Sequence, residues 1–227
     1  MLPLYEAKMI HHYDTKWATY EPNGSVRDVT ADEKRDPDFF VMPRYWVHEP
    51  ELTKALPADF NGTTFFGFRN IARATDARTI IGSLVPVVPV GHSMPLIFCN
   101  NPRMLQSVLT CFAADYAMRQ KLGGTNLTYN YMQQLPFPSQ IQWAEVASSA
   151  EGVVDRLNAQ HLDRETNARL RVQLDALMFR VYGIEREDVD YIMETFPIVK
   201  RKDLAAHGSY RTKDLILTAY DQLEEIR

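Results

Sequence analysis

The sequence predicts an α+β protein, in which a small mixed β-sheet domain is followed by a helical C-terminal region. Residues 63–100 contain runs of β-branched and aromatic residues separated by Pro and Gly, a pattern typical of short strands. Residues 101–123 form an amphipathic segment with helix-capping residues at both ends, and apolar residues recur at helical spacing from residue 148 onward. We therefore predict an α+β domain over residues 1–140 and a helical region over residues 141–227.

The elements follow in order along the chain. Prolines spaced through residues 20–62 favour short strands and loops. Residues 63–68, 78–91 and 95–100 are predicted strands. A single helix is then expected from the N-cap Asn101 to the C-cap Gly123. A capping box at Ser148 and Glu151 begins a long helix that ends at Gly183, a shorter helix stops at Pro197, and the last helix starts near Thr212.

Composition narrows the class of protein. The chain has 227 residues, 45% of them hydrophobic, which is enough for a substantial core. No residue run resembles a signal peptide, and none approaches the roughly 18 apolar residues of a membrane-spanning helix. Cys99 and Cys111 lack the spacing of a metal or redox motif, which favours a reduced, cytoplasmic setting.

Charge is distributed unevenly. Residues 1–59 carry 7 basic and 11 acidic side chains, and residues 141–227 carry 12 and 16, so each segment has a net charge of −4. Residues 60–140 carry 6 basic and 2 acidic side chains, a net charge of +4, and five of the six cations are arginines. Arginine is suited to bidentate contacts with phosphate or guanine. A mixed solvated surface is the alternative explanation.

Several fragments are close to catalytic signatures, and each lacks a required residue. "GHSMP" at residues 91–95 has Pro95 where the nucleophile elbow needs its last glycine. "HHYD" at residues 11–14 has no second group of metal ligands at the usual spacing. "FFGFR" lacks the second glycine of an S-adenosylmethionine loop, and "NNPR" lacks the second proline and the aromatic of an adenine-binding motif. We expect no catalytic residue and no metal site in this chain.

Five phrases of the sequence resemble the target-recognition region of Taq-type adenine-specific DNA methyltransferases and of fused restriction–modification enzymes. They occur in the family's order and span nearly the whole chain. Ala7 stands where the family's first phrase has glycine. The phrases are "LPLYEAKMIHHYDTKWATY" (2–20), "FRNIARATDARTIIGSLVP" (68–86), "GGTNLTYNYMQQLPFP" (123–138), "LDALMFRVYGIEREDVDYIMETFPIVKRKD" (174–203) and "YRTKDLILTAYDQL" (210–223).

The resemblance implies that the parent enzyme binds S-adenosylmethionine and methylates an adenine in duplex DNA. This portion would read the DNA site, while a separate catalytic domain would hold the cofactor and modify the flipped base. The expected partners are therefore double-stranded DNA and the methyltransferase catalytic domain, and no cofactor is expected in this chain. A protein-interaction module that never touches DNA is the alternative, and the overall acidity favours it.

Candidate DNA contacts are residues whose side chains bind phosphates or base edges. The loop at residues 123–138 offers donors, acceptors and a stacking ring without charge, although such groups also satisfy a loop's own backbone. Cations precede it at the end of the predicted helix. The predicted set is Lys8, His11, Arg69, Arg73, Arg78, Thr79, Arg119, Lys121, Thr125, Asn126, Tyr129 and Asn130.

Overall fold

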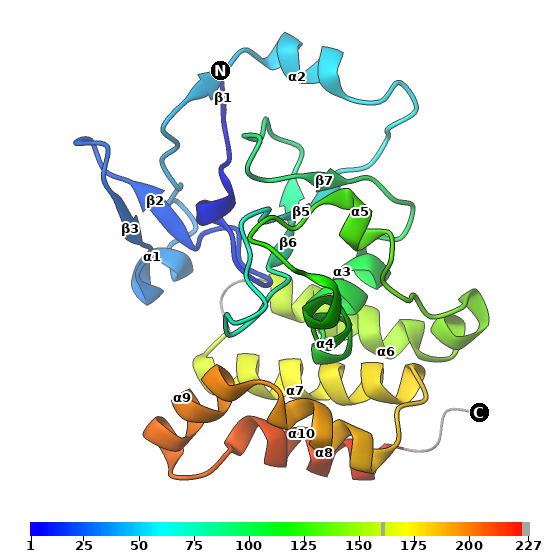
Figure 1. Ribbon diagram of the computed structural model, residues 1–227. Coiled ribbons are helices and arrows are strands. Elements are labelled where there is room, and N and C mark those ends of the chain that lie inside the picture. The colour runs from blue at the N-terminus through cyan, green and yellow to red at the C-terminus, as the bar shows by residue number, and fades with distance from the viewer. Residues whose placement is uncertain (160–161, 224–227) are drawn as a thin grey trace.

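The computed structural model describes residues 1–159 and 162–223, and it confirms the α+β class. Short strands and loops form the N-terminal part, and helices form the C-terminal part (Figure 1). The strands are β1 (Leu2–Pro3), β2 (Ala18–Tyr20), β3 (Val26–Asp28), β4 (Trp46–Val47), β5 (Thr64–Phe68), β6 (Gly82–Pro86) and β7 (Leu96–Ile97), with a 3₁₀ turn η1 (Ala7–Met9).

The helices lie between and after these strands. Two short ones, α1 (Ala31–Arg35) and α2 (Glu49–Ala55), belong to the N-terminal part. The others are α3 (Pro102–Thr110), α4 (Phe112–Lys121), α5 (Tyr129–Met132), α6 (Gln140–Asn158), α7 (Arg164–Val181), α8 (Arg186–Glu194), α9 (Pro197–His207) and α10 (Arg211–Gln222). Within the described residues, no helix combines the length and the apolar character that crossing a bilayer requires.

The central sheet separates two hydrophobic cores. Its strand order is β6-β5-β7, and Phe66 of β5 lies opposite Leu84 of β6 and Ile97 of β7. Side chains alternate along a strand, so Phe66 and Phe68 pack into the larger, helix-covered core while Phe65 packs into the smaller N-terminal core. The pairs β1-β4, β2-β3, β5-β6 and β5-β7 are all antiparallel, so the mixed sheet that the sequence suggested is not formed by these strands.

The helix predicted from Asn101 to Gly123 is two helices. Asn101 is the N-cap of α3, and its side chain accepts from the Met104 N–H at 2.9 Å. The backbone leaves the helical conformation at Cys111, with φ −81° and ψ 160°. A new helix, α4, starts at Phe112, whose N–H donates to the Asp175 carboxylate at 2.8 Å. A side chain 63 residues further along the chain therefore caps this second helix, which the local pattern could not show.

The boundary near residue 140 marks a change of element type but does not separate two cores. Helix α6 begins there with a capping box between Ser139 and Gln142, not at the predicted Ser148 and Glu151. One hydrophobic cluster includes Phe66 of the sheet, Leu109 of α3, Val154 of α6 and Leu174 of α7. Pro197 starts α9, where the sequence had indicated only the end of a helix. The helical region thus packs against the sheet and α3 in the same hydrophobic core.

Gly152 lies in the middle of α6 and is exposed. A Cβ atom at this position would meet no atom within 4 Å. We expect Gly152→Ala to raise the free energy of unfolding by about 0.5–1 kcal/mol, because alanine loses less backbone entropy in a helix. Urea unfolding of the two proteins measures the difference. A destabilised variant would show that α6 is not a regular helix at this residue.

Candidate functional site

Two segments that are far apart in the sequence pair to form a polar surface. The Ala72 N–H donates to the Thr125 carbonyl at 3.0 Å, and the Leu127 N–H donates to the Asn70 carbonyl at 2.6 Å. Ile71 and Asn126 form an antiparallel bridge between these bonds. In Figure 1 the loop between β5 and β6 therefore runs beside the loop between α4 and α5. This pairing joins the second and third phrases of the sequence resemblance.

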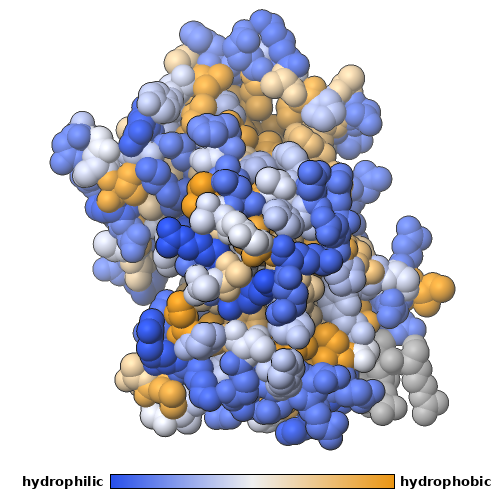
Figure 2. All heavy atoms as spheres, in the orientation of Figure 1, coloured by the Kyte–Doolittle hydropathy of each residue, from blue (hydrophilic) through white to orange (hydrophobic). Residues whose placement is uncertain are grey.

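The paired loops expose several of the predicted residues. Arg73, Lys121, Thr125, Asn126 and Asn130 are all exposed. Within residues 1–159 and 162–223, no hydrogen bond or ion pair engages their side-chain atoms. Figure 2, drawn in the orientation of Figure 1, shows a mainly hydrophilic face with scattered apolar patches. These side chains are therefore free to bind a ligand. We call these five residues the polar surface.

Tyr129 anchors the end of this loop. Its hydroxyl donates to the Leu96 carbonyl and accepts from the Leu96 N–H, each at 3.1 Å. Its ring lies edge-on to Phe68 with the ring centroids 6.0 Å apart, yet the residue remains 49% exposed. Tyr129 thus has a structural role in joining α5 to β7, and its exposed ring face borders the polar surface.

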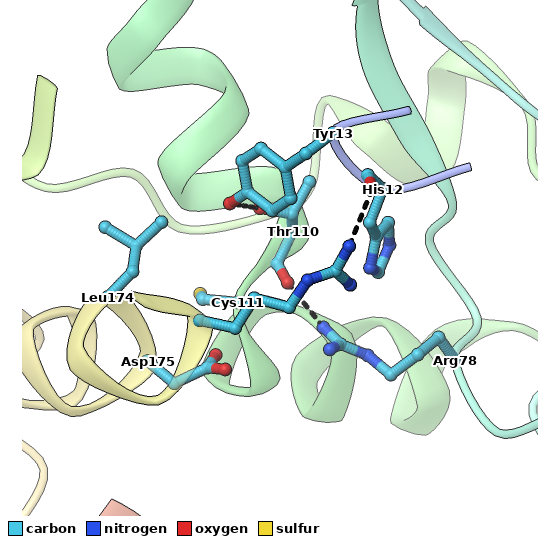
Figure 3. Close-up of a pocket in the computed structure, with 8 residues that line it drawn as sticks. His12, Tyr13, Arg78, Thr110, Cys111, Leu174 and Asp175 are labelled. Carbon is cyan, nitrogen blue, oxygen red and sulfur yellow. Dashed lines mark hydrogen bonds between the residues drawn. The ribbon is translucent and has the colours of Figure 1, made fainter. Parts of the chain in front are cut away.

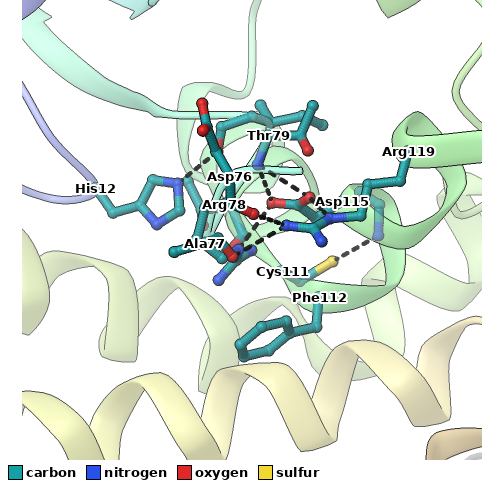
Figure 4. Close-up of polar contacts among 12 residues, drawn as sticks. His12, Asp76, Ala77, Arg78, Thr79, Cys111, Phe112, Asp115 and Arg119 are labelled. Atoms are coloured by element: carbon teal, nitrogen blue, oxygen red, sulfur yellow. Dashed lines mark hydrogen bonds and ion pairs between the residues drawn. The ribbon is translucent and has the colours of Figure 1, made fainter. Parts of the chain in front are cut away.

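Three predicted contact residues are instead held inside the protein around Asp115 (Figure 4). Asp115 is fully buried, and its carboxylate accepts from Arg78 Nε at 2.8 Å and from Arg119 Nε at 3.1 Å. The backbone N–H of buried Thr79 also donates to both Asp115 oxygens, at 3.1 and 3.0 Å. Each guanidinium packs over an aromatic ring, Arg78 over Phe112 and Arg119 over Phe196. We name these residues, Arg78, Thr79, Asp115 and Arg119, the Asp115 cluster.

The Asp115 cluster corrects the sequence interpretation of these cations. The Arg78 and Arg119 side chains are only 14% and 7% exposed, and both also donate to backbone carbonyls. A guanidinium held in this way is not available to a DNA phosphate. Burial of the carboxylate requires these partners, because an unpaired buried charge is strongly unfavourable. Arg78, Thr79 and Arg119 therefore stabilise the fold and do not belong to the DNA-contact set.

Arg69 is also used within the fold. Its Nε and Nη2 donate to the Ile10 carbonyl at 3.1 and 2.6 Å, which ties the N-terminal segment to the end of β5. Burial lowers the pKa of Arg69 below its usual value. Of the six lysines and arginines in the predicted set, Lys8, Arg73 and Lys121 are exposed, whereas Arg69, Arg78 and Arg119 are at least partly buried.

The histidine pair forms part of a tight turn. Tyr13 has a positive φ of 57°, and the backbones of His11 and Asp14 pair across the turn. His12 is buried, with its Nε2 2.6 Å from the Ile80 carbonyl. The His11 ring lies 4.4 Å from the Trp17 ring, and burial, followed by nearby Arg69, lowers its pKa to about 3. His11 therefore stays neutral at physiological pH and cannot bind phosphate as a cation.

Lys8 is exposed in the 3₁₀ turn η1. Its ammonium lies 5.1 Å from the centre of the Tyr20 ring. This weak cation–π contact leaves the ammonium accessible to solvent. Lys8 therefore remains a candidate for phosphate contact, although no hydrogen bond between described backbone groups connects its turn to the polar surface.

A second buried carboxylate, Asp175, lies next to the Asp115 cluster. Asp175 lines a cavity of about 20 Å³ with Arg78, Arg171, His12 and Tyr13 (Figure 3). Burial raises the pKa of Asp175 from 3.8 to about 6, while Arg78, the Phe112 N–H and Arg171 act in the opposite direction. The sequence alone does not reveal this residue, because nothing local to α7 shows that Asp175 faces the start of α4.

The raised pKa predicts a pH-dependent stability. The fold favours the protonated form of Asp175. Protonation of this carboxyl therefore stabilises the fold fully below pH ~4. This stabilisation is lost as the pH rises through about 6. An asparagine at this position would keep an acceptor for the Phe112 N–H without ionising. We expect Asp175→Asn to become more stable than the wild type as the pH rises across this window, by about 3 kcal/mol above it.

Urea unfolding of both proteins at a series of pH values measures this difference. His11 and His12 titrate in both proteins, so their contributions cancel when the two curves are subtracted. A difference that does not change between pH ~4 and ~7 would show that Asp175 is ionised normally in the fold.

The fold also shows where the fragments that are close to catalytic signatures lie. Residues 91–95 connect strand β6 to strand β7, whereas a nucleophile elbow joins a strand to a helix. Among the described residues, no histidine hydrogen bonds to Ser93, and no group of three His, Cys, Asp or Glu side chains is arranged to hold a metal ion. Cys99 and Cys111 are both free thiols, and Cys111 is buried at the break between α3 and α4.

Comparison with protein-family models, with curated proteins and with solved structures finds no match.

Proposed function

We propose that this chain is the DNA sequence-recognition portion of an adenine-specific DNA methyltransferase or restriction–modification enzyme. The observation that carries the proposal is the pairing of residues 70–72 with residues 125–127. It brings two of the five resembling phrases into one surface. That surface presents Arg73, Lys121, Asn126 and Asn130. Within the described residues, no hydrogen bond or ion pair engages these four side chains.

The chemistry of these side chains suits duplex DNA. Arg73 and Lys121 carry positive charges that can neutralise phosphates. Asn126 and Asn130 offer both a donor and an acceptor, the combination that reads an adenine edge in the major groove. The backbone pairing holds the loop in place, which base readout requires. The proposed roles are therefore phosphate contact for the cations and base contact for the asparagines.

The proposal leaves the chemistry of methylation to another domain. S-Adenosylmethionine would have to be bound elsewhere. Residues 65–69 are the fragment whose sequence is most similar to an S-adenosylmethionine loop, but they form most of β5, the central strand of a sheet, and the residue that follows it. A Cβ at Gly67 would lie 3.2 Å from the Met94 side chain, so this glycine makes room for a core residue rather than a cofactor. The expected partner is thus the catalytic domain of the parent chain.

Variants of the polar surface should divide into two classes. Arg73→Ala and Lys121→Ala should weaken binding to every duplex and lower the salt slope by about one unit per lost phosphate contact. Asn126→Ala and Asn130→Ala should relax sequence choice, at roughly 1–3 kcal/mol per lost base contact, with little change in slope. Binding of a cognate and a scrambled duplex, measured across a salt series, distinguishes the classes.

Arg201→Ala is the matched control, because Arg201 is an exposed cation on α9 and belongs to neither of the paired loops. It should leave the salt slope unchanged. If all four variants bind both duplexes as the wild type does, the polar surface does not contact DNA. If the wild-type chain shows no salt-dependent binding to any duplex, the chain is not a DNA reader.

One observation favours the alternative, a module that docks onto another protein. The segment before β4 exposes apolar side chains, with Phe40 at 77%, Met42 at 51% and Tyr45 at 56%. Aromatic and methionine side chains are enriched where proteins bind each other. Under this alternative, Phe40→Ser with Tyr45→Ser abolishes partner binding, while Arg73→Ala has no effect.

A further inference from the structure

A large groove lies at the end of the helical region, apart from the polar surface. Its volume is about 620 Å³, within the range of small-molecule sites. Helices α7, α9 and α10 form most of its wall, and the His11–His12 turn, Ala77, Arg78 and Phe112 complete it. None of Arg73, Lys121 and Asn126 lines the groove, so an inference about it does not rest on the proposed DNA surface.

The groove carries an excess of positive charge in a protein whose net charge is −4. Five cationic side chains line it, against three carboxylates. Arg211 is neutralised by Glu165 at 2.7 Å, and Asp203 is engaged by the Thr212 N–H at 2.6 Å. The remaining cations are Arg78, which Asp115 already holds, and Arg164, Arg171 and Lys202. In the part of the chain that the structure describes, the carboxylates that remain without a cation are Asp175 and Asp203, since a backbone N–H leaves the charge of Asp203 in place.

Three of these cations lack a carboxylate partner among the described residues. Arg171 donates to two neutral acceptors, the His12 carbonyl at 2.8 Å and the Asn167 side chain at 2.7 Å. Arg171 is only partly exposed, and burial lowers its pKa. Arg164 and Lys202 are exposed, and within the described residues no ion pair or hydrogen bond engages either side chain. An anion in the groove would compensate all three.

The same groove has an apolar side. Phe112, Val172, Val199 and Leu215 line it together with alanines at positions 77, 168 and 206. A free inorganic anion would leave this surface in contact with water. A ligand that combines an anionic group with a flat apolar body would cover both parts.

We propose that this groove binds a phosphate ester attached to an aromatic body, the chemistry of a nucleotide. Arg164, at the start of α7, and Lys202, in the middle of α9, bind the phosphate at the mouth of the groove. Arg171 provides the fixed positive charge at the inner wall. The valines, Leu215 and Phe112 contact the aromatic body. The ligand is either a free nucleotide or a nucleotide of a DNA strand.

Titration of the whole chain with adenosine 5′-monophosphate, followed by calorimetry, tests the proposal. We expect saturable binding of the monophosphate, and binding at least ~10-fold weaker for adenosine and for inorganic phosphate, because each lacks one of the two contacts. Arg164→Ala and Lys202→Ala should each weaken binding about 10-fold, since each removes a charge-assisted contact. Neither side chain has a partner in the described part of the fold, so neither substitution should alter stability.

Arg201→Ala is the control, because Arg201 is adjacent to Lys202 on α9 and does not line the groove. It should bind the monophosphate as the wild type does. Equal affinities for adenosine and its monophosphate, or full affinity in the Arg164→Ala, Lys202→Ala double variant, would overturn the proposal. Competition with duplex DNA then identifies the source: displacement of the monophosphate assigns the groove to a DNA strand, and simultaneous binding assigns it to a free nucleotide.

Discussion

Asp115→Ala is expected to lower the free energy of unfolding by about 3–5 kcal/mol, the usual effect of removing one partner from a buried ion-pair network. Asp115 is fully buried and holds Arg78, Arg119 and the Thr79 N–H. Without the carboxylate, two guanidinium groups lose their only ion-pair partner within the described residues. Urea unfolding followed by circular dichroism measures the change.

Asp155→Ala is the matched control for this substitution. Asp155 also pairs with an arginine, Arg103 at 2.6 Å, but both side chains are about half exposed, at 55% and 45%. Solvent screens such a pair, so we expect a loss below about 1 kcal/mol. If the two substitutions have similar effects, the Asp115 cluster is hydrated and is not the internal ion-pair network described above.

Gly82→Ala is the second substitution with a large expected effect. A Cβ at position 82 would lie 2.8 Å from the Gly67 carbonyl oxygen and would overlap the ring of Phe66, which is fully buried. The obstacle is partly backbone, so a side-chain rotation cannot relieve it. The pair β5-β6 would have to shift apart, and we expect a loss of about 3 kcal/mol, at the upper end of the effects of overpacking.

Gly123→Ala provides the comparison, because a Cβ there meets no atom within 4 Å and its φ is not positive. This substitution should change the free energy of unfolding by less than about 0.5 kcal/mol, as exposed substitutions usually do. Thermal or urea unfolding of both variants suffices. A Gly82→Ala protein as stable as Gly123→Ala would mean that β5 and β6 are not in the register described.

The local pattern of the sequence was sufficient for much of the fold. Asn101 followed by Pro102 predicts a helix start, and the structure places α3 there. Strand-like runs at residues 63–68 and 78–91 correspond to β5 and β6. These predictions succeed because capping and alternation depend on residues only a few positions apart. The break at Cys111 was missed because Asp175, which accepts from the first N–H of the second helix, lies far along the chain.

For the candidate site, too, some features follow from the sequence and others only from the fold. The sequence by itself determined which side chains have the chemistry that the proposed DNA contacts require, and it determined the basic charge of residues 60–140. Only the tertiary structure decided which of those residues are free to do so. Arg78 and Arg119 meet Asp115 in the core, whereas Arg73, Lys121 and Asn126 remain exposed. The physical reason is that a buried carboxylate must be compensated by nearby cations, and the fold selects which arginines reach it.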